Sequence, residues 1–289
     1  MGWVIDDAAR LRAYCTRIGL ADPPVASAKG LATIQAAHRR AIPFENLSIR
    51  LGDAIACDSD AVFAKLVTAR RGGFCFEHNR LLADMLEAAG FDVRLLLARV
   101  LLGARDTTPP RTHCLVLVQL GGTPWIADAG FGGAYAPPMP LADGADAASG
   151  DGARHCLTRI GEDGDLPGAW LLERKGPRDS TDGRGASDTA WEKQFAFDLT
   201  QVAPADMALG CHWAATHPFS RFTGHTVVNR CLSNGFASLV DLDFSGWRAG
   251  DPPEKRRIES PAEYRTLLAE EFALDLELSQ VDRLSLWSR

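Results

Sequence analysis

The sequence predicts an α+β protein of two or three domains. The first third has apolar residues at helical spacing, and from about residue 92 the pattern changes to strand-like runs. The last third, from about residue 203, mixes both patterns. A length of 289 residues is more than one hydrophobic core usually serves, so more than one domain is expected.

Two helices are expected in the first 42 residues, the first of them beginning near Asp6 or Asp7. A second helix runs from about residue 28 to His38 and ends before Pro43, because a residue that precedes proline is pushed out of the α region. Residues 43–47 follow as a compact turn. The first helix, capped by Asp6 or Asp7, would have an apolar face made of Ala8, Leu11, Tyr14, Cys15 and Ile18.

A third helix, capped near Asp58 or Asp60, leads into the glycine pair at 72–73. Residues 80–89 then have apolar side chains at helical spacing, which places Cys75 at or near the first turn of a fourth helix. Gly90 is the expected C-cap.

Three longer strands are expected in the middle of the chain, over residues 92–102, 111–120 and 124–128. Gly121-Gly122 provides a tight turn between the second and the third. The result is a plausible antiparallel meander.

Two polar, glycine-rich stretches are interpreted as a surface loop (residues 137–153) and a mobile loop (residues 176–190). Short strands are expected near residues 155–160, 170–173, 194–198, 226–232 and 237–242. Helices are expected over residues 204–216 and from Pro261. Ser260 would cap the second of these helices, with Glu263 at N3.

Composition narrows the class of protein. The formal net charge of −6 argues against nucleic acid or an anionic membrane as the main partner. No apolar run is long enough to span a bilayer, and residues 1–7 do not resemble a secretory signal. Seven widely spread cysteines without a Cys-x-x-Cys pair favour reduced thiols over a disulfide framework, so a cytoplasmic protein is expected.

Cys75 is the strongest candidate for chemistry. A thiol in the first turn of a helix faces unpaired backbone N–H groups and the positive end of the helix dipole, and Arg70 and Arg71 add positive charge upstream. These features predict a depressed thiol pKa. We interpret Cys15, Cys57, Cys114, Cys156 and Cys231 as small buried apolar residues.

A nucleophilic cysteine needs a base and a group that orients the base. His113 lies 38 residues after Cys75, and Asp128 ends the next strand. In a simple hairpin register, His113 and Asp128 miss being direct cross-strand partners by two positions. A bulge or a slightly longer turn would accommodate this offset. His113 and Asp128 can therefore lie together on one face, with the carboxylate holding the imidazole tautomer.

By themselves, these residues also fit other classes of function. A hydrolase or peptidase would use the same three residues. A zinc protein would use Cys75 and His78, whose spacing occurs in zinc sites, but no second pair at suitable spacing completes four ligands. Phe44, Phe74, Phe131 and Trp213 are, singly, more typical of a core than of a binding pocket.

The segment Arg-Arg-Gly-Gly-Phe-Cys-Phe-Glu-His-Asn at residues 70–79 closely resembles the active-site segment of arylamine N-acetyltransferases. Further segments resemble that family's other signatures and follow in its order. They are Ala-Ile-Pro-Phe-Glu-Asn-Leu at 41–47, Arg-Thr-His at 111–113, Asp-Ala-Gly-Phe-Gly at 128–132 and Thr-His-Pro-Phe-Ser-Arg-Phe at 216–222.

The resemblance implies a fold and its domains. Residues 1–92 would form a helical bundle with the catalytic cysteine, residues 93–202 a β-barrel with the catalytic histidine and aspartate, and residues 203–289 an α/β lid. The first two would resemble the core of papain-like cysteine proteases.

The resemblance also implies a ping-pong reaction on a Cys75–His113–Asp128 triad. Cys75 would take an acetyl group from acetyl-CoA and pass it to an arylamine or arylhydrazine, with no metal, nucleic acid or membrane involved. Glu77 and Asn79 would be structural supports. Family contacts to CoA map onto Thr112, Phe131, Gly132 and Phe222, and Phe131 would also line the acceptor pocket.

Overall fold

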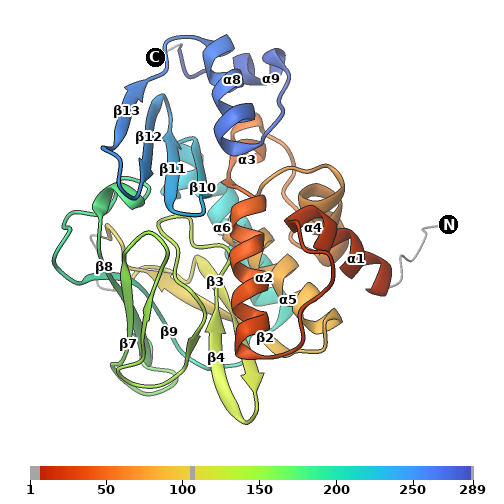
Figure 1. Cartoon of the computed structure of the whole chain (residues 1–289), viewed down its shortest axis with the longest axis vertical. Helices are drawn as coiled ribbons and strands as arrows, with labels where there is room; N and C mark the ends of the chain where they lie inside the picture. The colour runs from red at the N-terminus through yellow and green to blue at the C-terminus, as the bar shows by residue number, and fades with distance from the viewer. Residues whose placement is uncertain (1–6, 105–107, 288–289) are drawn as a thin grey trace.

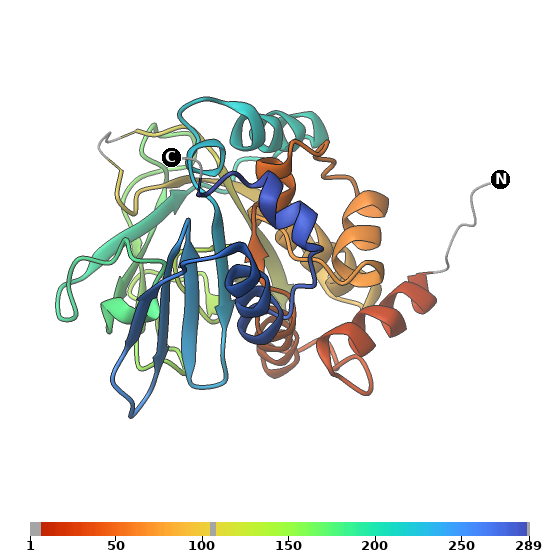
Figure 2. The ribbon, with the colours of Figure 1, turned by 90° about the horizontal axis from the view of Figure 1, so that it is seen from above.

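The computed structural model describes residues 7–104 and 108–287 (Figure 1). The helices of the first 90 residues lie to one side of an eight-stranded sheet, and the last third of the chain adds a second sheet with its own helices (Figures 1 and 2). This mixed arrangement confirms the α+β fold class.

The helices of the first third begin where polar side chains can satisfy their free N–H groups. Ser27 accepts a hydrogen bond from the Gly30 N–H, and Asp58 does the same for the Ala61 N–H. The expected cap at Asp6 lies outside the described residues. The helices are α1 (Asp7–Ile18), α2 (Ala28–Ala41), α3 (Leu47–Leu51), α4 (Ser59–Phe63), the π-helical turn η1 (Ala64–Thr68) and α5 (Cys75–Ala88).

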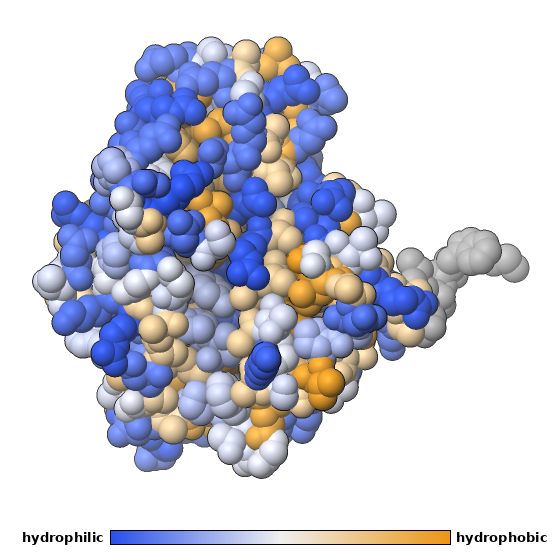
Figure 3. All heavy atoms as spheres, in the orientation of Figure 1, coloured by the Kyte–Doolittle hydropathy of each residue, from blue (hydrophilic) through white to orange (hydrophobic). Residues whose placement is uncertain are grey.

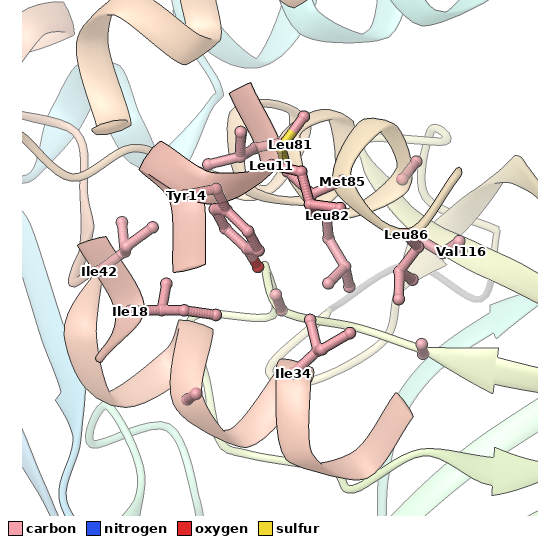
Figure 4. Close-up of a cluster of buried hydrophobic side chains, with 14 of the residues drawn as sticks. Leu11, Tyr14, Ile18, Ile34, Ile42, Leu81, Leu82, Met85, Leu86 and Val116 are labelled. Atoms are coloured by element: carbon pink, nitrogen blue, oxygen red, sulfur yellow. The ribbon is translucent and has the colours of Figure 1, made fainter. Parts of the chain in front are cut away.

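The main helical core packs α1, α2 and α5 against one another and against the eight-stranded sheet. Figure 4 shows its side chains converging from these elements. Their burial removes apolar surface from water, the main favourable term in folding. The largest members include Leu11, Tyr14, Ile18, Ile34, Ile42, Leu81, Leu82, Met85 and Leu86.

The eight-stranded sheet has the order β5-β4-β3-β2-β9-β8-β7-β6, with every neighbouring pair antiparallel, and it nearly closes into a barrel. The expected meander is confirmed in its first three strands. The strands are β2 (Asp92–Val100), β3 (His113–Leu120), β4 (Thr123–Ala127), β5 (Met139–Pro140), β6 (Asp146–Ala148), β7 (Arg154–Arg159), β8 (Trp170–Lys175) and β9 (Glu192–Phe197).

Two stretches expected as loops are more ordered than their composition indicates. Residues 137–153 contain β5 and β6, because Met139 is buried and β5 pairs with β4. Residues 176–190 contain the 3-10 turn η2 (Arg178–Ser180), and the side chain of Asp182 is buried. Buried contacts thus fix parts of both stretches.

The second sheet has the order β1-β10-β11-β12-β13 and is also antiparallel. Its first strand, β1 (Phe44–Glu45), comes from the helical third, where a turn was expected. The other elements of the last third are α6 (Pro204–Thr216), α7 (Arg221–Gly224), β10 (Val227–Cys231), β11 (Gly235–Val240), β12 (Asp243–Arg248), β13 (Glu254–Arg257), α8 (Pro261–Phe272) and α9 (Leu278–Arg283).

The sequence patterns predicted some of these elements and missed others. The α6 bounds match the expected helix, and the Ser260 hydroxyl caps α8 as expected, accepting from the Glu263 N–H. β13 was missed because its four residues are all charged and exposed, so they carry no apolar alternation. β1, β12 and α9 were missed as well.

A disulfide joins Cys57, in the loop before α4, to Cys211 in α6. The expectation of reduced thiols throughout is therefore wrong at these two positions. The partners are 154 residues apart in sequence, so no local spacing could reveal the pair. The remaining five cysteines are free thiols.

The longest helices in residues 7–104 and 108–287 are α2 and α5, with 14 residues each. No helix there is long and apolar enough to cross a bilayer. On the face drawn in Figure 3, hydrophilic side chains predominate and apolar side chains form smaller patches. We retain as a proposal the domain division at residues 92 and 202. The first boundary falls at Asp92, the first residue of β2, and the second falls between β9 and α6.

Candidate active site

Cys75 is the first residue of α5, as its spacing predicted, and its side chain is buried. The helix begins there because Glu77 satisfies a free donor: its carboxylate accepts a hydrogen bond of 3.0 Å from the Phe74 N–H. Lys65 pairs with the other oxygen of Glu77 at 2.7 Å. Glu77 thus supports the start of the helix.

His113 and Asp128 meet at one end of the β3–β4 hairpin. The pairing keeps a simple register up to Val116 opposite Ala127, with no bulge. Asp128 is the first residue beyond β4, where the chain has left the ladder. His113 Nε2 lies 2.8 Å from Asp128 Oδ2. The chain's departure from the sheet, and not a bulge, therefore removes the offset of two positions.

Asn79 fills the gap that the end of the ladder leaves. Its amide nitrogen donates to the Cys114 carbonyl oxygen at 2.6 Å and to Asp128 Oδ1 at 2.9 Å. Its amide oxygen accepts from the Ala129 N–H at 2.9 Å. Asn79 lies one turn after Cys75 on α5, so it fixes the cysteine's helix against the strand that carries His113.

Several contacts bring Cys75 beside His113. The Cys75 thiol lies 3.6 Å from the Thr112 carbonyl oxygen, one residue before His113. A methyl group on Gly130 would lie 2.7 Å from the Cys75 Cα and from its carbonyl oxygen, so only glycine permits this approach. Cys75 and His113 also line one cavity of about 690 Å³.

Burial governs the acidity of the site. It raises the pKa of the Cys75 thiol, the charge of Asp128 adds to this, and backbone hydrogen bonds oppose it without outweighing it. The expected depression of the thiol pKa is therefore wrong for this arrangement. Burial also opposes ionisation of Asp128, but His113, Asn79 and the Gly130 N–H outweigh it and hold the Asp128 pKa below its usual range.

The two arginines before the glycine pair do not supply the expected field. Arg71 pairs with the buried carboxylate of Glu45 at 2.9 Å. Arg70 is exposed and has a positive φ of 54°. Arg71 has a structural role, because its ion pair with Glu45 ties the segment before α5 to β1.

The four residues expected to contact CoA line the cavity that contains Cys75, and aromatic side chains form an aromatic wall on it. Phe131 packs edge-on to His113, with ring centroids 5.3 Å apart. The expected residues are Thr112, Phe131, Gly132 and Phe222. Trp213, Phe219, Arg184 and Arg221 also line it.

Sequence patterns alone offered little reason to place these last four residues on the cavity. Phe219 and Arg221 lie within the segment 216–222, whose likeness to the family was a usable signal. Arg184 lies in a polar, glycine-rich stretch that carries no pattern, and only the fold brings it to the cavity.

The zinc interpretation finds no support in the arrangement of His78. Both of its ring nitrogens have partners, His38 at 2.8 Å and the Pro43 carbonyl oxygen at 3.1 Å. In the part of the chain that the structure describes, no three His, Cys, Asp or Glu side chains form a group that could hold a metal ion.

A larger cavity of about 910 Å³ runs along α5 and α6 and is bordered by the Cys57–Cys211 disulfide. It is lined by neither Cys75 nor His113. The smaller cavity is the candidate active site, because it joins the thiol, the imidazole and an aromatic wall.

Comparison with known proteins gives a consistent result. A family model described as N-acetyltransferase matches residues 28–281. The arylamine N-acetyltransferase / N-hydroxyarylamine O-acetyltransferase of Salmonella typhimurium is 34% identical over 266 residues, covering 91% of this chain and 88% of that protein. The arylamine N-acetyltransferase of Escherichia coli is 32% identical over 96% of this chain and 94% of that protein.

Solved structures agree with these relatives. The arylamine N-acetyltransferase structure from Salmonella typhimurium superposes with a TM-score of 0.86 at 30% identity, covering 97% of this chain and 99% of that one. The structure from Mycobacterium abscessus gives a TM-score of 0.84 at 28% identity, covering 98% and 96%.

Proposed function

The chain belongs to the arylamine N-acetyltransferases, an acyltransferase family, and from this premise we propose that it transfers acetyl groups from acetyl-CoA to arylamines or arylhydrazines through an acetyl-cysteine. The observation that carries the proposal is a buried thiol at a helix start that shares a cavity with a histidine held by an aspartate.

In the first half-reaction, Cys75 is the nucleophile and His113 the base. Asp128 engages Nε2 of His113, which leaves Nδ1 to take the thiol proton. The thiolate attacks the thioester carbonyl carbon, a new carbon–sulfur bond forms, and the bond to the CoA sulfur breaks. The imidazolium returns its proton to the leaving CoA thiolate, and the acetyl group stays on Cys75.

In the second half-reaction, the amine replaces CoA in the same cavity. The amine nitrogen attacks the acetyl carbonyl while His113 takes the amine proton, and the carbon–sulfur bond to Cys75 breaks. The proton then passes to the cysteine sulfur, which restores the resting enzyme. Burial of Cys75 favours transfer over hydrolysis, because it limits the access of water to the thioester.

The raised pKa of the Cys75 thiol fits this scheme. A thiol that resists ionisation by itself becomes a nucleophile only when a neighbouring base takes its proton. We propose that Thr112, Phe131, Gly132 and Phe222 contact the donor, and that Phe131 forms a flat wall for the aromatic acceptor.

The proposal is tested by mixing the protein with acetyl-CoA in the absence of an amine and measuring intact mass. We expect a persistent gain of one acetyl group that is absent from Cys75→Ala, and its discharge when an arylamine is added. Rapid turnover of acetyl-CoA without an amine would instead identify a hydrolase that uses the same residues.

A further inference from the structure

Among the described residues that line the Cys75 cavity, permanent charge lies at one place. Of the described residues that line it, Arg184 and Arg221 are the only lysine, arginine, aspartate or glutamate side chains. Arg184 comes from the stretch before β9, and Arg221 begins α7. Two distant segments thus bring guanidinium groups to one wall.

Both arginines also line a second, more open hollow of about 560 Å³. Lys255 and Arg256, from strand β13, lie on the same hollow. Basic side chains therefore continue outward from the Cys75 cavity.

A buried carboxylate fixes the two guanidinium groups. The Asp182 side chain is 1% exposed and accepts contacts from Arg184 Nη2 at 2.8 Å and from Arg221 Nη2 at 3.5 Å. The Asp182 N–H donates to the Gly133 carbonyl oxygen at 3.1 Å, which anchors this stretch beside the cavity. One carboxylate between two guanidinium groups leaves one positive charge uncompensated.

We propose that Arg184 and Arg221 bind phosphate groups of the CoA donor; the inference rests on the proposed function, because it assigns the place of the donor's charged half. The uncharged arm of acetyl-CoA must enter the cavity to bring the thioester to Cys75. Its phosphates then need cations outside the aromatic wall. One guanidinium group can donate two parallel hydrogen bonds to two oxygens of a phosphate.

The overall charge of the chain makes such a site necessary. A formal net charge of −6 repels a polyanionic donor at long range. The positive charge that Asp182 leaves uncompensated on Arg184 and Arg221 offsets that repulsion where the donor enters. Lys255 and Arg256 add little to it, because they already pair with the carboxylates of Asp179, Glu254 and Glu263.

The test compares two acetyl donors, acetyl-CoA and the phosphate-free ester p-nitrophenyl acetate, by the rate at which Cys75 is acetylated. In Arg184→Gln and Arg221→Gln, we expect the half-saturating acetyl-CoA concentration to rise about tenfold, the size expected for losing a charge-assisted hydrogen bond. The rate with p-nitrophenyl acetate should not change. Equal effects on both donors, or none on either, would overturn the proposal.

Two further measurements guard against a folding defect. Arg184→Lys keeps a cation beside the buried Asp182 and should retain part of the preference for acetyl-CoA. In the unaltered protein, added salt should raise the half-saturating concentration of acetyl-CoA but not that of p-nitrophenyl acetate. Arg12→Gln removes an exposed arginine of α1 and serves as the matched control, with both donors unaffected.

Calorimetry with CoA itself separates this inference from the proposed reaction, because CoA binding requires no chemistry. Weaker CoA binding by Arg184→Gln than by the unaltered protein supports the site even if Cys75 is never acetylated. Equal binding by the two proteins refutes the site even if acetyl transfer occurs.

Discussion

At the scale of single residues, the two carboxylate oxygens of Asp128 have separate partners. Oδ2 faces His113 Nε2. Oδ1 accepts from the Asn79 amide and from the Gly130 and Phe131 N–H groups. The residue therefore has two roles: it stabilises the turn after β4 and it is the partner of His113.

Replacing Asp128 by asparagine should keep the fold and remove most activity. The amide can no longer accept on both sides, so the imidazole tautomer and the imidazolium lose support. We expect the acetylation rate of Cys75 to fall by a factor on the order of 10²–10⁴. The matched control is Asp151→Asn, a buried carboxylate outside this cavity. A near-normal rate in Asp128→Asn contradicts the assignment.

The Cys75 thiol should depend on His113 for its reactivity, since burial raises its pKa. We expect iodoacetamide to alkylate Cys75 at neutral pH in the unaltered protein and at least about tenfold more slowly in His113→Gln, with reactivity recovering only at alkaline pH. Peptide mapping must isolate Cys75, because Cys156 is a partly exposed free thiol that iodoacetamide can alkylate as well. Equal rates in both proteins would show that His113 does not take the thiol proton.

At the scale of secondary-structure elements, a chain of hydrogen bonds joins α1, α2 and α5. His78 Nε2 donates to the Pro43 carbonyl oxygen, so its Nδ1 accepts from His38 Nε2 at 2.8 Å. His38 Nδ1 in turn accepts from the Tyr14 hydroxyl at 2.8 Å. Burial lowers the pKa of both His38 and His78, so both imidazoles are neutral in this chain of hydrogen bonds.

This chain predicts loss of stability in mild acid. Burial and the charge of Arg39 lower the pKa of His78 to about 3, against roughly 6.5 in the unfolded chain. As pH falls below about 6.5 the unfolded state binds a proton that the folded state does not, so stability is full above that pH and is lost toward pH 3. Between pH 7 and pH 5 the loss from this one histidine is roughly 2 kcal/mol.

Urea unfolding across this pH range checks the prediction. We expect His78→Gln to be less stable than the unaltered protein at pH 7 but to lose less stability on acidification. His212→Gln, which changes an exposed histidine of α6, is the control and should keep the full pH dependence. An unchanged slope in His78→Gln would exclude this residue as the source.

At the scale of the whole molecule, the Cys57–Cys211 disulfide ties the helical third to α6. The same helix carries Trp213 and Ala214, which line the Cys75 cavity. Phe76, next to Cys75, packs closely on α6, where a methyl group on Gly210 would lie 2.7 Å from its ring. The crosslink thus holds together two segments that border the candidate active site.

Counting thiols tests the crosslink. Alkylation under denaturing conditions should label five thiols before reduction and seven after it. The double variant Cys57→Ser/Cys211→Ser should lose about 2–4 kcal/mol of unfolding free energy, because the unfolded chain is no longer constrained. Cys156→Ser is the control and should be near neutral. Seven labelled thiols without reduction would disprove the disulfide.

The sequence by itself determined the local features of this protein. Helical spacing placed Cys75 in the first turn of α5, proline and serine set the start of α8, and the short turn at Gly121-Gly122 set the β3–β4 hairpin. These features depend on neighbours within a few residues, so periodicity and capping rules suffice to predict them. The segment likenesses added the family and the reaction that it implies for the three candidate residues.

Only the tertiary structure decided how distant segments meet. It brought Cys57 to Cys211, β1 into the C-terminal sheet, Asn79 into the gap beyond β4 and Arg184 to the cavity. It also reversed the expected shift of the Cys75 pKa, since desolvation depends on everything packed around the thiol. Long-range contacts and burial are properties of the whole packed chain, and no local pattern encodes them.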